Sequence, residues 1–292
     1  MSIDGISVTH ENGYAGCGVY VGIGGTLRMY SGKISDNQFS TAKGGNGGGV
    51  YNDGTFVMSG GIITNNTARY YGGGVANWGD SFVMSGGEIS GNTVSDRGGG
   101  VYHGKGEFTM SGGEISNNWA DFSGGGVHSR VDTFTMSGGV ISGNTANNWG
   151  GGVFNQDGEF TMSGGEISGN TAKSGGGVLN TGNFTMLGGK ISKNTVHGPS
   201  SFVGGEGFGG GVSNWEGTFE LRGGKISGNK ASNGGGDVYY LGDAYYFGVK
   251  DSELIICVGV VFVVLGVVVA IMLFMSKKKR RAHVTEKLSN SI

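Results

Sequence analysis

Proline, cysteine and charge are all scarce in this chain of 292 residues, and each scarcity excludes a class of protein. Gly accounts for 67 residues but Pro for only 1, and no Gly-x-y triplet repeats, which excludes collagen. The 2 cysteines, Cys17 and Cys257, cannot provide a disulfide framework. No glycine-rich stretch is followed by Gly-Lys-Ser/Thr or a helix signal, so nucleotide phosphate binding is rejected. The slight acidic excess argues against a nucleic-acid partner.

A repeat of about 26 residues dominates the sequence. Gly-Gly-Gly followed by Val ends at Val50, Val75, Val101, Val127, Val153, Val178 and Val212, and a degenerate copy places Val238 after Asp237. A second block recurs between these marks, and its Met falls at positions 58, 84, 110, 136, 162 and 186. A fixed period of this length predicts stacked structural units, and the constant register argues against disorder.

Each unit contains three short runs in which apolar residues stand two apart or isolated between polar ones. In the unit that starts at Val153 the runs are 153–155, 159–162 and 166–168. This alternation is typical of β-strands, and the glycine and asparagine between the runs are typical of turns. Because side chains alternate across a strand, we expect one Val, Phe, Met and Ile of every unit to face inward together.

One such unit cannot fold alone. Four large apolar side chains contribute about 6–12 kcal/mol of burial, whereas ordering the unit costs roughly 1–2 kcal/mol per residue. Stacking adds parallel hydrogen bonds and a continuous core, and connections between parallel strands are overwhelmingly right-handed. We therefore predict an all-β fold over residues 1–247, a right-handed parallel β-helix of about eight to nine coils. The first coil is irregular, and the long step from Val178 to Val212 predicts an inserted loop at about 196–207.

The C-terminal part has a different character. Residues 254–275 form an uncharged apolar run of 22 residues, which as an α-helix would extend about 33 Å and span a membrane. Residues 248–253 are the expected linker to it. A basic cluster follows the run, and its expected role is contact with anionic lipid. The cluster consists of Lys277, Lys278, Lys279, Arg280 and Arg281.

Charge divides the chain at this run. Residues 1–275 carry 14 basic and 21 acidic groups, a net charge of −7, whereas residues 276–292 carry 6 and 1, a net charge of +5. The positive-inside rule therefore places the tail 276–292 in the cytosol and the repeats outside the cell or in a lumen. Residues 1–5 lack the features of a signal peptide, so we expect N-terminal sequence to be missing. The alternative is a tail-anchored protein with cytosolic repeats.

The Gly-Gly-Gly-Val and Phe-Thr-Met-Ser-Gly-Gly blocks resemble the right-handed β-helix repeats of the pectate-lyase-like class. Within it they are most similar to the polymorphic outer-membrane protein repeats of chlamydiae, which also occur in surface proteins of parasitic protists and some bacteria. That family has Gly-Gly-Ala before an aliphatic residue and Phe-x-x-Asn. Here Gly replaces the Ala, and Ser163 stands where the Asn after Phe160 would be. The resemblance covers residues 16–240 and implies adhesion or interaction with a host surface.

Aromatic residues follow several of the landmark valines. Tyr51, Tyr102, Phe154 and Tyr239 occupy this position and are expected to point outward. Exposed aromatic rings in a line can stack on sugars or anchor a partner protein, although they can also simply cover neighbouring apolar surface.

Two further groups are candidate binding residues. Glu88 and Glu114 share a repeat position and are expected about 4.8 Å apart on adjacent coils, where they could bind calcium or only form a solvated face. Phe202 and Phe208 lie around the inserted loop, a place where solenoids often locate specificity.

Asparagine occurs in two patterns. One is a column two residues after the landmark Val, in which hydrogen bonds from coil to coil are expected. Its members are Asn52, Asn77, Asn155, Asn180 and Asn214, with His103 and Ser129 as replacements. The other pattern is a pair of N-glycosylation acceptor tripeptides, 65–67 and 183–185, which arise easily in a chain rich in Asn and Thr.

These features predict a membrane-anchored, cell-surface repeat protein that acts in adhesion or binds a host, protein or glycan partner, without catalytic residues, metal or cofactor. The alternative is a carbohydrate-active enzyme, a polysaccharide lyase or hydrolase of the pectate-lyase-like class, in which Glu88 and Glu114 would act.

Overall fold

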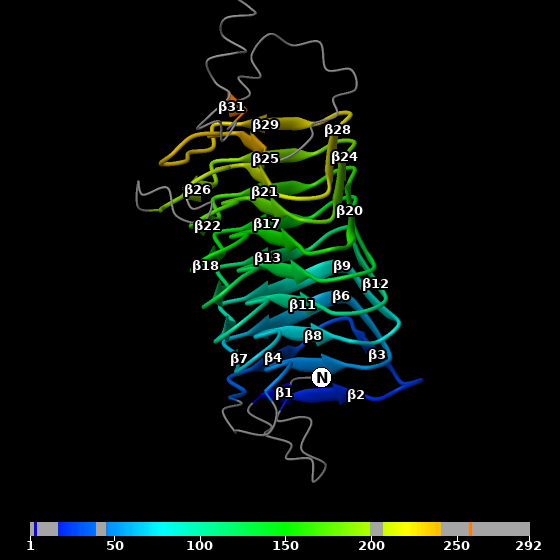
Figure 1. Ribbon diagram of the computed structural model, residues 1–292. Coiled ribbons are helices and arrows are strands. Elements are labelled where there is room, and N and C mark those ends of the chain that lie inside the picture. The colour runs from blue at the N-terminus through cyan, green and yellow to red at the C-terminus, as the bar shows by residue number, and fades with distance from the viewer. Residues whose placement is uncertain (1–2, 5–16, 39–44, 199–206, 241–256, 259–292) are drawn as a thin grey trace, which may run out of the picture. The chain divides into compact units, whose positions relative to one another are not determined.

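The computed structural model describes residues 3–4, 17–38, 45–198, 207–240 and 257–258. They form a parallel β-solenoid of about eight turns, with the strands of successive coils stacked one above another (Figure 1). No α-helix occurs among these residues, all of which belong to one compact unit that ends at Val258. The predicted all-β solenoid is therefore confirmed.

The landmark valines begin the strands of one sheet. Val and its two successors pair in register from coil to coil, for example Val127 with Val153. This sheet has ten strands, β2 (Val19–Val21), β5 (Val50–Asn52), β8 (Val75–Asn77), β11 (Val101–His103), β15 (Val127–Ser129), β19 (Val153–Asn155), β23 (Val178–Asn180), β27 (Val212–Asn214), β30 (Val238–Tyr240) and β31 (Cys257–Val258).

The Phe and Ile runs of each repeat form a second sheet of fifteen strands. In two coils the runs join into the long strands β6 (Thr55–Thr64) and β9 (Ser81–Ser90), whose pairing shifts register around Ser59. The other Phe strands are β3 (Thr26–Met29), β12 (Glu107–Met110), β16 (Thr133–Met136), β20 (Glu159–Met162), β24 (Asn183–Met186) and β28 (Thr218–Leu221). The other strands of this sheet are β1 (Ile3–Asp4), β4 (Lys33–Ser35), β13 (Glu114–Ser116), β17 (Val140–Ser142), β21 (Glu166–Ser168), β25 (Lys190–Ser192) and β29 (Lys225–Ser227).

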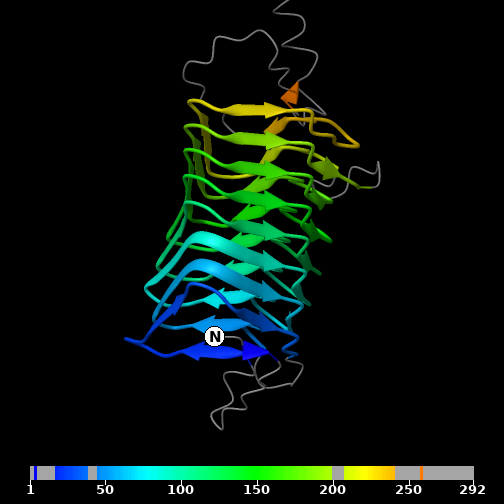
Figure 2. The ribbon, with the colours of Figure 1, turned by 180° about the vertical axis from the view of Figure 1, so that it is seen from behind.

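A third sheet consists of two-residue strands that the sequence did not predict. Its six members are β7 (Thr67–Ala68), β10 (Thr93–Val94), β14 (Trp119–Ala120), β18 (Thr145–Ala146), β22 (Thr171–Ala172) and β26 (Thr195–Val196). The glycine and asparagine between the runs were predicted to form turns, but in Gly143-Asn144-Thr145 only the glycine has a left-handed backbone, with a φ of 63°. Thr145 can therefore extend and pair with Trp119 of the preceding coil. The short strands of this sheet stack along one side of the solenoid (Figure 2).

The solenoid interior is filled by the Val, Phe, Met and Ile of the repeats, as predicted. The phenylalanines stack face to face along the axis, with ring centroids 4.6 Å apart on both sides of Phe134. Phe134, Met136 and Ile141 are fully buried, like their equivalents in the neighbouring coils. Each coil therefore completes the core of the next one.

A buried asparagine ladder, which the sequence pattern did not predict, lies at the turn before the third sheet. The Asn144 side chain donates from Nδ2 to Oδ1 of Asn170 at 3.0 Å and to the Ile115 carbonyl at 2.9 Å. Its Oδ1 accepts from both the backbone N and Nδ2 of Asn118, at 2.9 and 3.0 Å. The ladder comprises Asn37, Asn66, Asn92, Asn118, Asn144, Asn170, Asn194 and Asn229.

The two ladders end differently. The missed ladder ends on the Asp237 carboxylate, which accepts from the backbone N and Nδ2 of Asn229 at 2.9 and 2.8 Å. The predicted column after the landmark Val is confirmed in part, since Asn155 donates to Asn180 at 2.7 Å and Asn180 to Asn214 at 2.6 Å. Asn77 Nδ2 still reaches Nδ1 of His103, and the column breaks after it, because His103 Nε2 and Ser129 Oγ have no hydrogen-bond partner among the described residues.

Several predicted segments lie outside the described residues. These are the linker 248–253, the tail 276–292 and positions 199–206 of the inserted loop. Of the apolar run 254–275 only Cys257–Val258 are described, paired in parallel with β30. Within the described ranges no helix is long and apolar enough to cross a membrane. The transmembrane helix therefore stays a prediction.

The insertion leaves the stacking intact, because Val178 pairs directly with Val212.

Candidate binding surface

The aromatic residues after the landmark valines do not form the exposed line that the sequence predicted. Tyr51, Tyr102, Phe154 and Tyr239 are only 8%, 0%, 5% and 5% exposed. Their side chains lie on the opposite side of the strand from the landmark Val, as strand alternation requires. The expectation of exposure is nevertheless wrong, because an outer layer of side chains covers them.

The glycine run allows this outer layer to form, because it lets the backbone pass close to the residue after the landmark Val. Gly98 has a φ of 73°, and a Cβ on it would lie 2.8 Å from the Cα and Cβ of Tyr102, so only glycine fits where the chain passes this residue. Residues from the preceding coil then close over the ring. Tyr71 and Trp78 contact Tyr102 at centroid distances of 4.4 and 5.3 Å. The result is a second, smaller core outside the strands.

A groove interrupts the outer layer over three successive coils. The middle coil has the small residues Ser174 and Thr181 where the coil before it has Trp149 and the coil after it has Trp215. Thr181 lines the groove together with both tryptophans. The two indole rings approach across this gap, with centroids 5.6 Å apart and planes at 73°. Trp215 is held by a hydrogen bond from its Nε1 to Ser213 Oγ at 3.0 Å. The small residues of one coil thus form the groove.

The lining of the groove combines apolar and polar groups. Its volume is about 240 Å³, and buried Phe154 and Leu179 lie among its residues. The carboxylates of Asp157 and Glu216 are on exposed residues, and the lining contains no lysine or arginine. Gln156 is fixed through Oε1, which lies 3.2 Å from His128 Nε2. Such a lining suits a ligand with an apolar face and hydroxyl groups at its edge.

Two histidines are fully buried, and one of them, His128, contacts Gln156 of the groove. Burial lowers the pKa of His128 to about 3 and that of His103 to about 4. Ser123 Oγ lies 2.9 Å from Nδ1 of His128, and Asn77 Nδ2 donates to Nδ1 of His103 at 3.2 Å. Both rings therefore remain neutral in the folded state at ordinary pH.

We expect the solenoid to lose stability as the pH falls from about 7 toward 4. The unfolded chain protonates both histidines near pH 6.5, whereas the folded chain does not, so the unfolded state binds more protons in this window. Each histidine lowers the free energy of unfolding by up to about 1.4 kcal/mol per pH unit. Urea denaturation of the full chain in mild detergent at about pH 7 and about pH 5 measures the effect.

The matched variant is His103→Asn, which places at this position the residue of the preceding coil, Asn77. It should remove roughly half of the loss that the two buried histidines cause, because only His128 of the pair then remains. An unchanged loss in His103→Asn would show that His103 does not contribute.

Glu88 and Glu114 lie side by side, as predicted, since they are register partners in β9 and β13. Glu114 Oε1 accepts a hydrogen bond from Ser142 Oγ at 3.2 Å. Apolar Ile62 and Val140 flank the two acids in the same column. Within the described part of the chain, no group of three His, Cys, Asp or Glu side chains could hold a metal. The structure therefore brings the pair together without gathering a third acidic ligand beside it.

The remaining predicted residues fall outside the groove. Phe208 is buried and stacks on Tyr239 with ring centroids 4.2 Å apart. Its predicted contact with a binding partner stays a prediction. Phe202 and the cluster 277–281 lie outside the described residues. The sequence pattern did not predict a role for Trp149 and Trp215, because they occupy different positions of the repeat. Trp149 directly precedes a glycine run and Trp215 directly follows a landmark strand, and neither position has the same residue type in every repeat. The available signal for the groove was a coil with small residues at two positions where the coil before it and the coil after it each have a tryptophan.

Comparison with known proteins gave no match to a protein-family model, no significant match among curated proteins, and none among solved structures. The functional inference therefore rests on the sequence and geometry of this chain.

Proposed function

We propose that this protein is a membrane-anchored surface protein whose solenoid binds a glycan in the groove that Trp149 and Trp215 line, in adhesion and not in catalysis. The observation that carries the proposal is the pairing of two half-buried indole rings with carboxylate and amide groups in one groove. Aromatic faces pack against the apolar face of a sugar, while carboxylates and amides accept and donate hydrogen bonds at its hydroxyls.

The charge of the groove selects among sugars. Asp157 and Glu216 contribute two negative charges, and no cation of the lining balances them. An acidic sugar would be repelled, so the expected ligand is a neutral sugar ring. The volume of about 240 Å³ is small and suits one ring of a longer glycan that runs along the outside of the coils.

Membrane anchoring is supported by the sequence. The run 254–275 has the length and composition of a spanning helix, and the basic cluster 277–281 follows it on the side expected to face anionic lipid in the cytosol. The repeated Gly-Gly-Gly-Val and Phe-Thr-Met-Ser-Gly-Gly blocks support right-handed winding of the pectate-lyase-like kind and kinship with the chlamydial-type surface repeats.

Replacing Trp215 with alanine should weaken glycan binding about tenfold, because the ligand loses one aromatic face. The measurement is binding of the full-length chain in detergent to an array of neutral and acidic glycans. Trp119→Thr is the control, since it removes a tryptophan from the third sheet and restores the Thr of the neighbouring coils. Equal losses in the two variants would contradict a specific groove.

Localisation and chemistry are tested separately. With an epitope tag at each end, protease added to intact cells should remove the N-terminal tag alone.

Cleavage of an acidic polysaccharide that disappears in Glu114→Gln would instead favour the carbohydrate-active enzyme and overturn the proposal.

A further inference from the structure

We propose that Asn65 carries an N-linked glycan, and that it is the preferred acceptor over Asn183. The inference rests on the proposed function, because the modification requires the repeats to enter a lumen. It is carried by the different surroundings of two identical acceptor patterns, Asn-x-Thr, in the folded chain.

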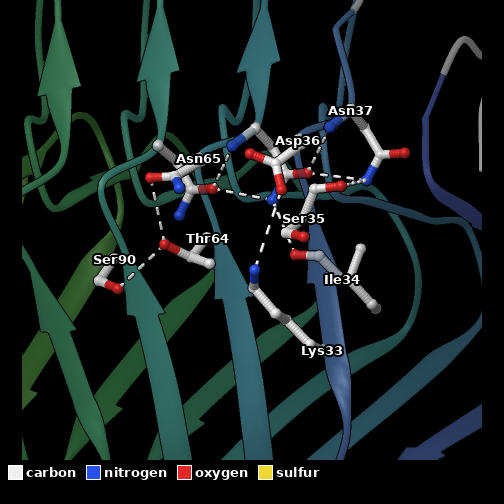
Figure 3. Close-up of polar contacts among 10 residues, drawn as sticks. Lys33, Ile34, Ser35, Asp36, Asn37, Thr64, Asn65 and Ser90 are labelled. Atoms are coloured by element: carbon white, nitrogen blue, oxygen red, sulfur yellow. Dashed lines mark hydrogen bonds and ion pairs between the residues drawn. The ribbon is translucent and has the colours of Figure 1, made fainter. Parts of the chain in front are cut away.

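Asn65 stands at an open corner of the solenoid. It is an exposed residue with a φ of 57°, in the turn between the end of β6 and the start of β7. Figure 3 shows its side chain beside Thr64, whose Oγ1 donates to Asn65 Oδ1 at 3.4 Å. Among the described residues none bonds to Asn65 Nδ2. Asn65 Nδ2, the atom that would carry the sugar, is therefore available at a turn, and attaching a sugar to it breaks no hydrogen bond.

The residue next to it makes the contrast plain. Asn66 is fully buried in the asparagine ladder and donates from Nδ2 to Asn92 Oδ1 at 2.9 Å and to the Ile34 carbonyl at 3.1 Å. The ladder fixes Asn66 toward the interior, and Asn65 is the residue that remains at the surface. Thr67, the third member of the acceptor pattern, begins β7 directly after it.

The second acceptor pattern is occupied by structural contacts. Asn183 lies in β24 between β20 and β28. Its Nδ2 donates to Glu159 Oε1 at 2.6 Å, and its Oδ1 accepts from Thr218 Oγ1 at 2.7 Å. A glycan on this nitrogen would leave a single N–H for Glu159 and would share the sheet surface with side chains of both neighbouring coils. The folded solenoid accommodates a glycan better at Asn65.

The chemical step is a glycosyl transfer from a lipid-diphosphate-linked oligosaccharide. Asn65 Nδ2 attacks the anomeric carbon C1, a new C1–N bond forms, and the C1–O bond to the diphosphate breaks. The lipid diphosphate leaves with the bonding electron pair, and one amide proton passes to a base of the transferase. No oxidation or reduction is involved.

The repeats provide a matched control at the same corner. Gly169 occupies the equivalent position, has a φ of 66°, and is followed by Asn170 and Thr171. A Cβ at Gly169 would come no closer than 3.9 Å to the nearest atom, which is the backbone N of Gly143. Gly169→Asn therefore creates a second acceptor pattern in the same geometry at an open site.

The experiment expresses the full-length chain in glycosylating eukaryotic cells and compares gel mobility before and after peptide-N-glycosidase, with mass spectrometry of the released peptides. One mobility step is expected in the parent. Asn65→Gln and Thr67→Ala should abolish it, whereas Thr67→Ser and Asn183→Gln should keep it. Gly169→Asn should add a second step.

The outcomes separate the two proposals. If Gly169→Asn is modified but Asn65 is not, or if modification occurs only at Asn183, the repeats do reach a lumen and the assignment of Asn65 is overturned. If no variant, including Gly169→Asn, is modified, the repeats do not enter a lumen, and both the glycan and the surface location are overturned.

Discussion

Replacing Asn144 with alanine is expected to lower the free energy of unfolding by about 3–6 kcal/mol. Asn144 makes four hydrogen bonds in the middle of the buried ladder. The substitution would remove all four and would leave the backbone N of Asn118 without its acceptor. Asn118 Nδ2 would keep only its bond to the Ile89 carbonyl, and Asn170 Oδ1 only the bond from the backbone N of residue 144. Each buried polar group left unsatisfied costs about 1–3 kcal/mol, and water reaches this ladder only if the coils separate.

Asn147→Ala is the control for Asn144→Ala. Asn147 lies in the same coil and donates from Nδ2 to Asp121, but it is exposed, so water replaces its partner. Its loss should stay within about 0.5 kcal/mol. Urea denaturation of the full-length chain in mild detergent measures both variants, and a similar midpoint for the two would refute a stabilising ladder.

Replacing Phe134 with alanine is the second large change, with an expected loss of about 3–5 kcal/mol. Phe134 is fully buried between Phe108 and Phe160, and its ring fills the whole separation between two coils. Neighbouring coils cannot close over the cavity, because their spacing is fixed by the strand hydrogen bonds on every face.

Thr135→Ala provides the comparison for Phe134→Ala, since Thr135 is the adjacent residue on the opposite side of β16 and is only half-buried. Its effect should be below about 1 kcal/mol. Because each coil contacts only its neighbours, hydrogen exchange should show the loss of protection concentrated in the coils next to Phe134. A loss spread evenly over the solenoid would contradict this expectation.

The interior of the solenoid was predictable because the same pattern of apolar residues occurs in many copies of the repeat. Phe108, Phe134 and Phe160 follow the same alternation with Met in each copy, and a single copy would have been ambiguous between a strand and a loop. The period also predicted the register, since a shift of one residue would turn every Phe and Met outward. The asparagine ladder was hidden inside a Gly-Asn-Thr pattern that resembles an ordinary turn, and its role appears only when Asn118 and Asn144 are stacked.

The outer surface was not predictable in the same way. Alternation correctly placed Tyr102 on the opposite side of its strand from Val101, but Tyr71 and Trp78, from the preceding coil, decide that it is buried. The groove likewise depends on Trp149 and Trp215, two coils apart, meeting over a coil of small residues.

The sequence by itself determined the stacked parallel coils and the residues of their interior, because the repeat period and strand alternation are local and are copied in every unit. Only the tertiary structure decided which outward residues are covered and where a groove opens. The physical reason is that burial outside the strands depends on the sizes of side chains from different coils, and these sizes vary from one repeat to the next.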